Sequence, residues 1–467
     1  MITKLEVDGF KSFAGFSVDL RPFTAIVGAN ASGKSNIFDA LTLLSRLVSM
    51  PVAQALAGGR GEAAEQFRRH GSRVASRMGF AVELLLDPEV EDTFGTREVL
   101  PHTRVRYEIT LEVREGEDGI SRPWVESESI RPLTASEDPL RRTVSPAFAE
   151  AHLKYGASRW TILRTEGTGR EKRFVFTPRR AGESRQGHPR VLPAGSATAS
   201  VLTSVPTADF SPLLYAVRRE VERWRVLQLD PAALRQPSPV GQATDRLQRD
   251  GANLAWVLET IARASRRGGP GLDALAADLA RVIRGFSAVE VAENDARGQW
   301  EVVLRSRDEG AISARVASDG TLRLLAVLAA LYEPESPGVL CFEEPENGIQ
   351  PARLGPLVQV LRDLVTDTAS DPVLDAGGKP SPLVQLLVSS HSPKLPLTSL
   401  VDELVVVDST ARVEADAVSR VTRARRVLEE DEELPEDADA QLVLPFSTRA
   451  EQSGLTREEA ERVVDPL

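Results

Sequence analysis

Apolar residues form short runs near both ends of the chain, and these runs alternate between the patterns expected of buried strands and of helices. Residues 23–27 are apolar and β-branched, which predicts a buried strand, and residues 37–48 place apolar side chains at helical spacing. The alternation returns after residue 300, with strands expected at 300–304, 339–342, 383–388 and 404–407 and helices at 320–332 and 352–365. Because such alternation implies parallel strands with right-handed crossovers, we expect both ends to form one α/β domain.

The middle of the chain is patterned less clearly. Residues 80–86 and 104–113 predict strands, whereas residues 116–210 are rich in Gly, Pro, Ser and Arg and predict irregular structure with short strands such as 173–176. From 212 to 285 the apolar spacing is helical. We therefore expect an N-terminal lobe over 1–115, an inserted, partly helical arm over 116–300, a C-terminal lobe over 301–410 and an acidic, flexible tail over 411–467.

Composition and charge narrow the class of protein. The 467 residues carry a net charge of −11, which argues against a surface coated with nucleic-acid-binding charge, although arginine-rich stretches at 170–190 and 218–225 leave local DNA binding open. The single cysteine, Cys341, excludes an internal disulfide framework. No apolar run approaches the ~20 residues that span a bilayer. Together with a charged start, this predicts a cytoplasmic protein without a membrane segment.

One octapeptide carries the strongest functional signal. Residues 28–35, GANASGKS, match G-x-x-x-x-G-K-[ST] between a predicted strand and a predicted helix. In that setting backbone N–H groups and the helix N-terminus hold phosphate oxygens. We expect ATP here, with Lys34 at its β- and γ-phosphates and Ser35 at Mg²⁺. The expected nucleotide-binding residues are Gly28, Asn30, Ala31, Ser32, Gly33, Lys34, Ser35 and Asn36.

Two acids follow the apolar strand predicted at 339–342. A phosphate-cleaving site needs one acid beside the metal ion and another that polarises the attacking water. Glu343, at the strand tip, is the expected metal-side acid, and Glu344 is the expected catalytic base.

A histidine follows the strand predicted at 383–388. His391 lies in the run SSHSP, where the carboxyl edge of a parallel sheet faces the ligand crevice. A neutral imidazole there can hydrogen-bond the γ-phosphate or the water, although such a histidine can also be structural. The remaining histidines lack metal-ligand spacing, so we expect no zinc site.

Residues 318–321, SDGT, precede the helix predicted at 320–332. Ser318 can cap that helix, and a Ser-X-Gly turn at a helix start can also bind an anion. On these residues alone, capping is the simpler interpretation.

The four motifs in this order, GANASGKS, SDGTLR, CFEEPENG and SSHSP, resemble the ABC-type ATPase heads of the SMC/RecF/OLD group. The opening run LEVDGFKSF is similar to the first strand of that group. The chain most resembles stand-alone "AAA family" ATPases without long coiled coils, which are often found in bacterial defence operons. The resemblance implies a P-loop NTPase fold, an ABC/SMC-head-like sheet sandwich with a mixed insertion.

The resemblance also implies an assembly. Two heads would face each other head to tail as a homodimer, so that Ser318, Asp319 and Gly320 of one protomer cap the ATP γ-phosphate held by Lys34 of the other. Lys11 and Ser12, after the first strand, are implied as further nucleotide contacts. Gln66 is implied as the glutamine that links Mg²⁺ to the arm.

Some residues depart from the group's pattern. Relatives commonly carry Asp where this chain has Glu343, His where it has Gln350 and, in transporters, Leu where it has Ala317. The Toprim nuclease motif of OLD-type relatives does not follow His391, so we expect a separate effector, a nuclease or toxin. Two alternatives stay open: a nucleotide-responsive scaffold that holds a partner protein, and a RecF-like DNA repair factor.

Overall fold

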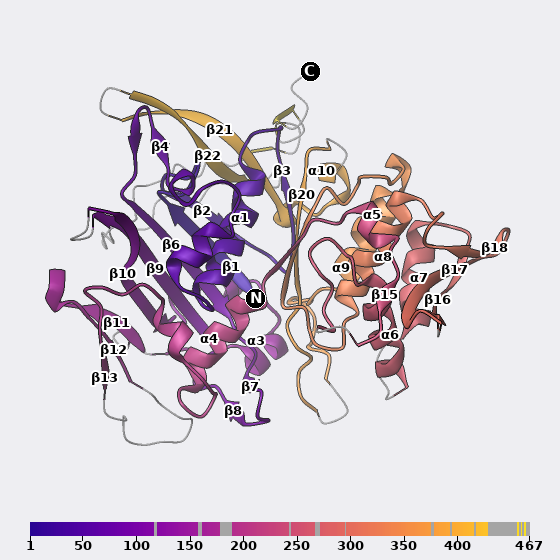
Figure 1. Ribbon diagram of the computed structural model, residues 1–467, viewed down its shortest axis with the longest axis horizontal. Coiled ribbons are helices and arrows are strands. Elements are labelled where there is room, and N and C mark those ends of the chain that lie inside the picture. The colour runs from indigo at the N-terminus through magenta and orange to yellow at the C-terminus, as the bar shows by residue number, and fades with distance from the viewer. Residues whose placement is uncertain are drawn as a thin grey trace.

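The computed structural model describes residues 1–115, 119–156, 161–177, 189–241, 244–266, 271–294, 296–374, 378–392, 395–414 and 417–427, with five further positions between 455 and 463. Arg179, Arg180 and the acidic block at 429–439 lie outside these ranges. Within them, no helix is both long enough and apolar enough to cross a bilayer. Two lobes lie side by side, with the strands that carry the nucleotide motifs between them (Figure 1).

The first lobe is built on an antiparallel eight-stranded sheet. In spatial order its strands are β13 (Arg190–Pro193), β12 (Arg173–Phe176), β11 (Leu163–Glu166), β10 (Ser121–Pro132), β9 (Arg104–Glu115), β6 (Arg77–Leu85), β1 (Ile2–Asp8) and β2 (Phe16–Asp19). Two small hairpins extend from this lobe, β4 (Arg69–His70) with β5 (Arg73–Val74), and β7 (Glu89–Glu91) with β8 (Arg97–Val99).

A mostly parallel six-stranded sheet forms the centre of the molecule. Its order is β14 (Arg225–Leu227), β19 (Val339–Glu343), β20 (Gln385–Ser390), β3 (Phe23–Val27), β21 (Leu404–Glu414) and β22 (Ala417–Arg426), of which only β22 runs antiparallel to its neighbour. A smaller antiparallel sheet belongs to the second lobe and contains β15 (Ser238–Pro239), β16 (Phe286–Asn294), β17 (Gln299–Ser306) and β18 (Gly310–Ser313).

Helices cover both faces of the central sheet (Figure 1). The α-helices of the described residues are α1 (Lys34–Leu47), α2 (Val52–Ala57), α3 (Pro146–His152), α4 (Pro212–Glu222), α5 (Pro231–Leu234), α6 (Leu254–Ser265), α7 (Leu272–Val282), α8 (Asp319–Leu331), α9 (Leu354–Asp363) and α10 (Leu395–Thr398). Side chains of the central strands alternate between two cores: Ile26 joins the first-lobe core, whereas Ala25 and Val27 join the second-lobe core. Burial on both faces explains why these strands are continuous apolar runs.

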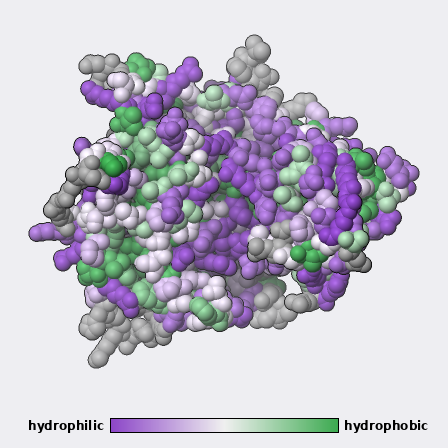
Figure 2. Space-filling view, in the orientation of Figure 1, coloured by the Kyte–Doolittle hydropathy of each residue, from purple (hydrophilic) through white to green (hydrophobic). Residues whose placement is uncertain are grey.

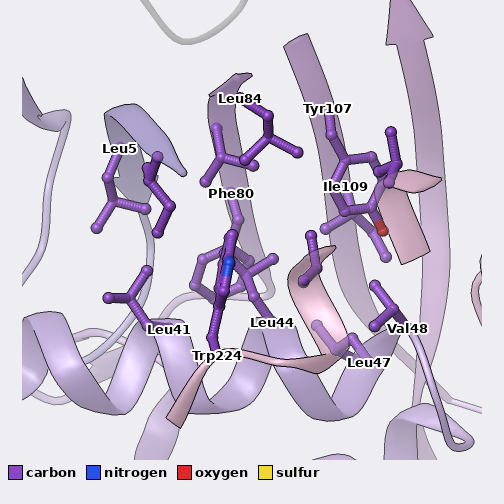
Figure 3. Close-up of a cluster of buried hydrophobic side chains, with 14 of the residues drawn as sticks. Leu5, Leu41, Leu44, Leu47, Val48, Phe80, Leu84, Tyr107, Ile109 and Trp224 are labelled. Atoms are coloured by element: carbon purple, nitrogen blue, oxygen red, sulfur yellow. The ribbon is translucent and has the colours of Figure 1, made fainter. Parts of the chain in front are cut away.

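Helix α1 packs between the eight-stranded sheet and the central sheet. Its apolar stripe, which includes Leu41, Leu44 and Leu47, faces Leu5, Phe80, Leu84 and Tyr107 of the eight-stranded sheet (Figure 3). Because α1 begins at Lys34, this packing fixes the loop before it against both sheets. On the face seen in Figure 1, hydrophilic side chains extend across the region between the lobes (Figure 2).

The α/β sheet sandwich expected from the sequence is confirmed, and several elements differ in detail. The irregular structure expected over 116–210 is wrong, because β10 is a 12-residue strand that pairs with β9. The eight-stranded sheet therefore continues across the boundary expected at 115/116. The strand at Trp300 belongs to the small antiparallel sheet rather than the parallel one. Residues 417–426, expected in the tail, form β22 at the edge of the central sheet.

Glu128 on β10 is a buried acid with three hydrogen-bond donors. Its carboxylate accepts from Ser200 Oγ at 2.6 Å, from the Val201 N–H at 2.7 Å and from Tyr107 Oη at 3.2 Å. Burial nevertheless raises the pKa of Glu128 from 4.5 to about 7, because desolvation outweighs these donors.

We expect this residue to make stability fall as pH rises between 4.5 and about 7. In that window the native state keeps a proton that the unfolded chain has lost, so the free energy of unfolding falls by up to about 1.4 kcal/mol per pH unit. Glu128→Gln has no proton to lose. Urea titrations across the window should show the stability difference moving in favour of the variant as pH rises, and a constant difference would contradict the raised pKa.

Candidate nucleotide-binding and hydrolysis site

The predicted motifs meet at one edge of the central sheet. β20 lies between β3 and β19, and all three run parallel, with Ser390 opposite Val27 and Glu343 opposite Ser389. The chain leaves these strand ends into the 28–35 loop, into Glu344 and into His391. Three segments far apart in the sequence are thus brought together because parallel strands end at a common edge.

The 28–33 loop needs its glycines for close approach. A Cβ on Gly28 would lie 2.1 Å from the Val407 carbonyl oxygen, and one on Gly33 would lie 2.0 Å from Thr422 Oγ1. Gly33 has φ +103° and Ala31 has φ +62°, so the loop curls in the left-handed region before α1 begins. Lys34 Nζ donates to the carbonyl oxygens of Gly28 and Ala29 at 2.7 and 2.8 Å. Asn30 and Ala31 are exposed at the loop tip.

A hydroxyl network supports this loop from the side of β22. Thr422 Oγ1 donates to the Ser32 carbonyl oxygen at 3.0 Å and lies 2.6 Å from Ser12 Oγ. Asn36 Nδ2 donates to Ser12 Oγ at 2.8 Å. In this conformation Ser12 and Asn36 hold the loop in place, and Thr422 is a residue that the sequence motifs did not indicate.

Lys34 is electrostatically coupled to three carboxylates. Burial lowers its pKa, while the charges of Glu344, Glu346 and Glu343 act in the opposite direction. The lysine of one predicted motif and the acids of another therefore share one site. The ammonium is held where it would meet phosphate oxygens.

Glu344 is held in a specific and strained position. Its φ of +53° is unfavourable for a residue with a Cβ, at a cost of about 1–2 kcal/mol. Its N–H donates to the Ser389 carbonyl oxygen at 2.8 Å, and its carboxylate accepts from Asn347 Nδ2 at 2.5 Å. The other carboxylate oxygen lies 3.1 Å from His391 Nδ1. Both side chains are 43% exposed, so water can reach the pair.

Glu346 links the acids to the histidine loop. Ser390 Oγ donates to one of its carboxylate oxygens, and the Ser392 N–H donates to the same Ser390 Oγ at 2.9 Å. The second oxygen of Glu346 is buried without a hydrogen-bond partner, and burial raises the pKa of this carboxyl. The contact fixes the segment on either side of His391.

Among the metal ligands predicted from the sequence, Glu343 has an oxygen that fits a divalent cation. Glu343 Oε1 is buried without a hydrogen-bond partner, which is the arrangement expected of an oxygen that awaits a ligand. Its other oxygen lies 3.5 Å from Arg60 Nη2, and Arg60 also approaches Asp39. Ser35, in the first turn of α1, and Glu343 would hold Mg²⁺.

Gln66 and Lys11 both make hydrogen bonds to other parts of the protein. Gln66 is 2% exposed, and its Nε2 donates to the Leu56 carbonyl oxygen at 2.5 Å. Lys11 Nζ donates to Asp39 Oδ2 at 2.5 Å. Both therefore have internal partners here, and their roles toward metal and nucleotide stay predictions.

The turn at 318–321 caps a helix. Ser318 Oγ accepts from the Thr321 N–H at 3.2 Å at the start of α8. Asp319 pairs with Arg235 at 2.5 Å, and a Cβ on Gly320 would lie 2.1 Å from the Gly348 carbonyl oxygen. Ser318 and Asp319 are exposed, and α8 lies in the second lobe, away from α1 (Figure 1). The structure thus brings together the 28–35 loop, the two acids and His391, while the turn packs through Gly320 on Gly348, in the loop that follows Glu344.

A family comparison agrees with these elements. The model of the family described as "AAA domain, putative AbiEii toxin, Type IV TA system" matches residues 23–158 and 220–397. The match includes the phosphate loop, the turn at 318–321, both acids and His391. The curated proteins contain no match to this chain.

Solved structures similar to this chain include heads of SMC proteins. An Smc head bound to the C-terminal winged-helix domain of ScpA is 14% identical with a TM-score of 0.46, and covers 90% of this chain and 97% of its own. An SMC head from Thermotoga maritima is 13% identical with a TM-score of 0.38, covering 92% and 99%. At these values the likeness carries no functional assignment.

The family match extends over well more than half of the chain and contains the residues that meet at the sheet edge. The match supports the binding of a nucleotide, as in ATPases. This chain belongs to the AAA-domain family that includes the putative AbiEii toxin.

Proposed function

We propose that this protein binds MgATP at residues 28–35 and hydrolyses it with Glu344 as the general base. The observation that carries the proposal is the Glu344–His391 pair, 3.1 Å apart, at the sheet edge that also holds Lys34. Glu344 would polarise the attacking water, and His391 would orient that water or contact the γ-phosphate. Bound Mg²⁺, held by Ser35 and Glu343, would neutralise charge on the phosphates.

The active form we propose is a cytoplasmic, ATP-gated homodimer. Ser318 caps α8, and Asp319 and Gly320 are its first residues; the N-terminus of a helix favours an anion. Ser318 and Asp319 are exposed, and helix α8 lies in the other lobe from α1, which follows the phosphate loop (Figure 1). A second protomer placed head to tail would bring this turn to that phosphate. ATP would then connect two heads, and hydrolysis would release them.

A separate effector completes the proposal. The family description names a putative toxin of a type IV toxin–antitoxin system, which agrees with a role in defence. The Toprim nuclease motif of OLD-type relatives does not follow His391, so we assign any cleavage of nucleic acid to a separate protein. The ATP-gated dimer would therefore act on a partner protein.

The alternative function, DNA binding, has less support than ATP hydrolysis. In the stretch 218–225, Arg218 donates to the Val205 carbonyl oxygen, Arg223 donates to the Ser336 carbonyl oxygen, and Arg225 forms a bidentate pair with Glu333. These arginines are engaged inside the protein, so they do not form the free basic surface that a phosphate backbone requires.

Nucleotide binding should stabilise the fold. A ligand present at about 100 times its dissociation constant adds about 2.7 kcal/mol. We expect MgATP to raise the thermal unfolding midpoint of the wild type and of Lys379→Ala, an exposed lysine, but not that of Lys34→Ala. Equal shifts in all three proteins would contradict binding at residues 28–35.

A further inference from the structure

A cavity of about 270 Å³ lies beside the proposed ATP site, since Arg60 in its lining approaches Glu343. It opens between α1 in the first lobe and the segments around Gln228 and Arg249. Four cations and one carboxylate line it, namely Lys11, Arg46, Arg60, Arg249 and Asp39. No residue of the 28–35 loop belongs to its lining, but Lys11 and Gln66, which the resemblance implies as nucleotide and Mg²⁺ contacts, do.

The spacing along α1 explains the shape of the cavity. Asp39 and Arg46 are seven residues apart, two helical turns, so both face the cavity. They are separated by about 10 Å along the helix axis. Asp39 forms the end nearest the ATP site, because Arg60 approaches both Asp39 and Glu343 at 3.5 Å. The cavity therefore extends from the metal side of the site along α1.

The charges in the cavity are unbalanced. Asp39 forms ion pairs with Lys11 at 2.5 Å and with Arg60 at 3.5 Å. Arg46 and Arg249 form no side-chain hydrogen bond or ion pair with any described residue. Burial and the charge of Arg249 lower the pKa of Arg46, while the charge of Asp39 acts in the opposite direction. Asp39 is the one acid among the described residues of the lining and already pairs with Lys11 and Arg60, so the lining carries an excess of positive charge that a bound anion would offset.

A cavity elsewhere in the molecule does not share this excess of positive charge. It has a volume of about 290 Å³ and also contains two arginines, Arg219 and Arg223. There Glu220 and Glu335 are among the acids of the lining, and the arginines lie beside them. That cavity carries its own counterions.

We propose that the cavity at Arg46 and Arg249 binds a phosphate oxyanion. Guanidinium groups bind phosphate through charge-assisted, often bidentate hydrogen bonds. A volume of 270 Å³ holds such an ion with several waters, since one water occupies about 30 Å³ in the liquid. The ion could be the product of hydrolysis, which rests on the proposed function, or free inorganic phosphate, which does not.

Inorganic phosphate is the probe, titrated by calorimetry into protein whose 28–35 loop is filled with saturating MgADP. We expect phosphate to bind the wild type. Its affinity for Arg249→Gln or Arg46→Gln should be about tenfold lower, because each variant loses one charged hydrogen bond. Arg305→Gln, an exposed arginine on β17, is the matched control and should bind as the wild type does. Arg249 is exposed, so its substitution leaves the core intact.

Unchanged phosphate affinity in both Arg249→Gln and Arg46→Gln would overturn the proposal. If MgADP itself fails to bind, the proposed function is wrong. The phosphate titration is then repeated on nucleotide-free wild type and Arg249→Gln, and a difference in affinity still shows whether the cavity binds phosphate. Single-turnover measurements separate the two sources. Faster phosphate release in Arg249→Gln at an unchanged cleavage rate identifies the product, whereas unchanged release with weakened phosphate binding identifies free phosphate.

Discussion

Glu344→Gln is expected to lower the ATP hydrolysis rate by about 10²–10⁴-fold, the usual contribution of a general base. The amide keeps the size of the side chain and can still contact Asn347 and His391, but it cannot accept a proton from water. ATP binding should therefore persist, because Lys34 and the 28–33 loop are unchanged. Phosphate release under saturating MgATP measures the rate, and nucleotide titration measures the binding.

The control for this variant is Glu309→Gln, which removes an exposed carboxylate from the second lobe and should leave the rate unchanged. A Glu344→Gln protein that hydrolyses ATP at the wild-type rate would exclude Glu344 as the base. Attention would then move to Glu346, whose charge also acts on Lys34.

Ser318→Arg is expected to abolish hydrolysis while each protomer still binds ATP. In the proposed dimer this position faces the partner's phosphate site, where an added cation would lie against Lys34 and the metal. Like charges placed together at an interface cost several kcal/mol, which corresponds to more than about 100-fold in dimer affinity. Ser287→Arg, an exposed serine on β16 in the same lobe, is the matched control and should hydrolyse ATP normally.

Mixing two inactive variants tests the shared site directly. A Lys34→Ala protomer keeps its turn at 318–321, and a Ser318→Arg protomer keeps its phosphate loop. Random exchange would place one complete site in half of the dimers and so restore about a quarter of the wild-type activity. A mixture that stays inactive, with exchange verified, would contradict a site built from two protomers.

The elements of the central sheet were predictable because they are buried on both faces. β3 and β19 are unbroken apolar runs, and each ends in its motif, so the local sequence contained both the strand and the chemistry. The contact between Glu344 and His391 followed from parallel strands that share an edge.

The long strand β10 was not predictable from alternation. Val125 and Ile130 are both buried, yet an odd spacing puts them on opposite faces of a regular strand. A register shift between Val125 and Ser127 corrects this, and such a bulge depends on pairing with β9.

Supporting residues of the site were missed for a related reason. Thr422 lies on an edge strand rich in arginine that follows no recognised motif, and its contact with Ser12 joins positions 410 residues apart. Arg60 approaches Glu343 only through the fold. Contacts of this kind depend on tertiary packing and leave no local pattern.

The most direct test of the account is the molar mass of Glu344→Gln by light scattering, with and without MgATP. The account predicts a smaller species that becomes a dimer when MgATP is added, and no such change once Ser318→Arg is combined with it. A mass that stays the same with and without MgATP would contradict the ATP-gated dimer and favour a constitutive scaffold.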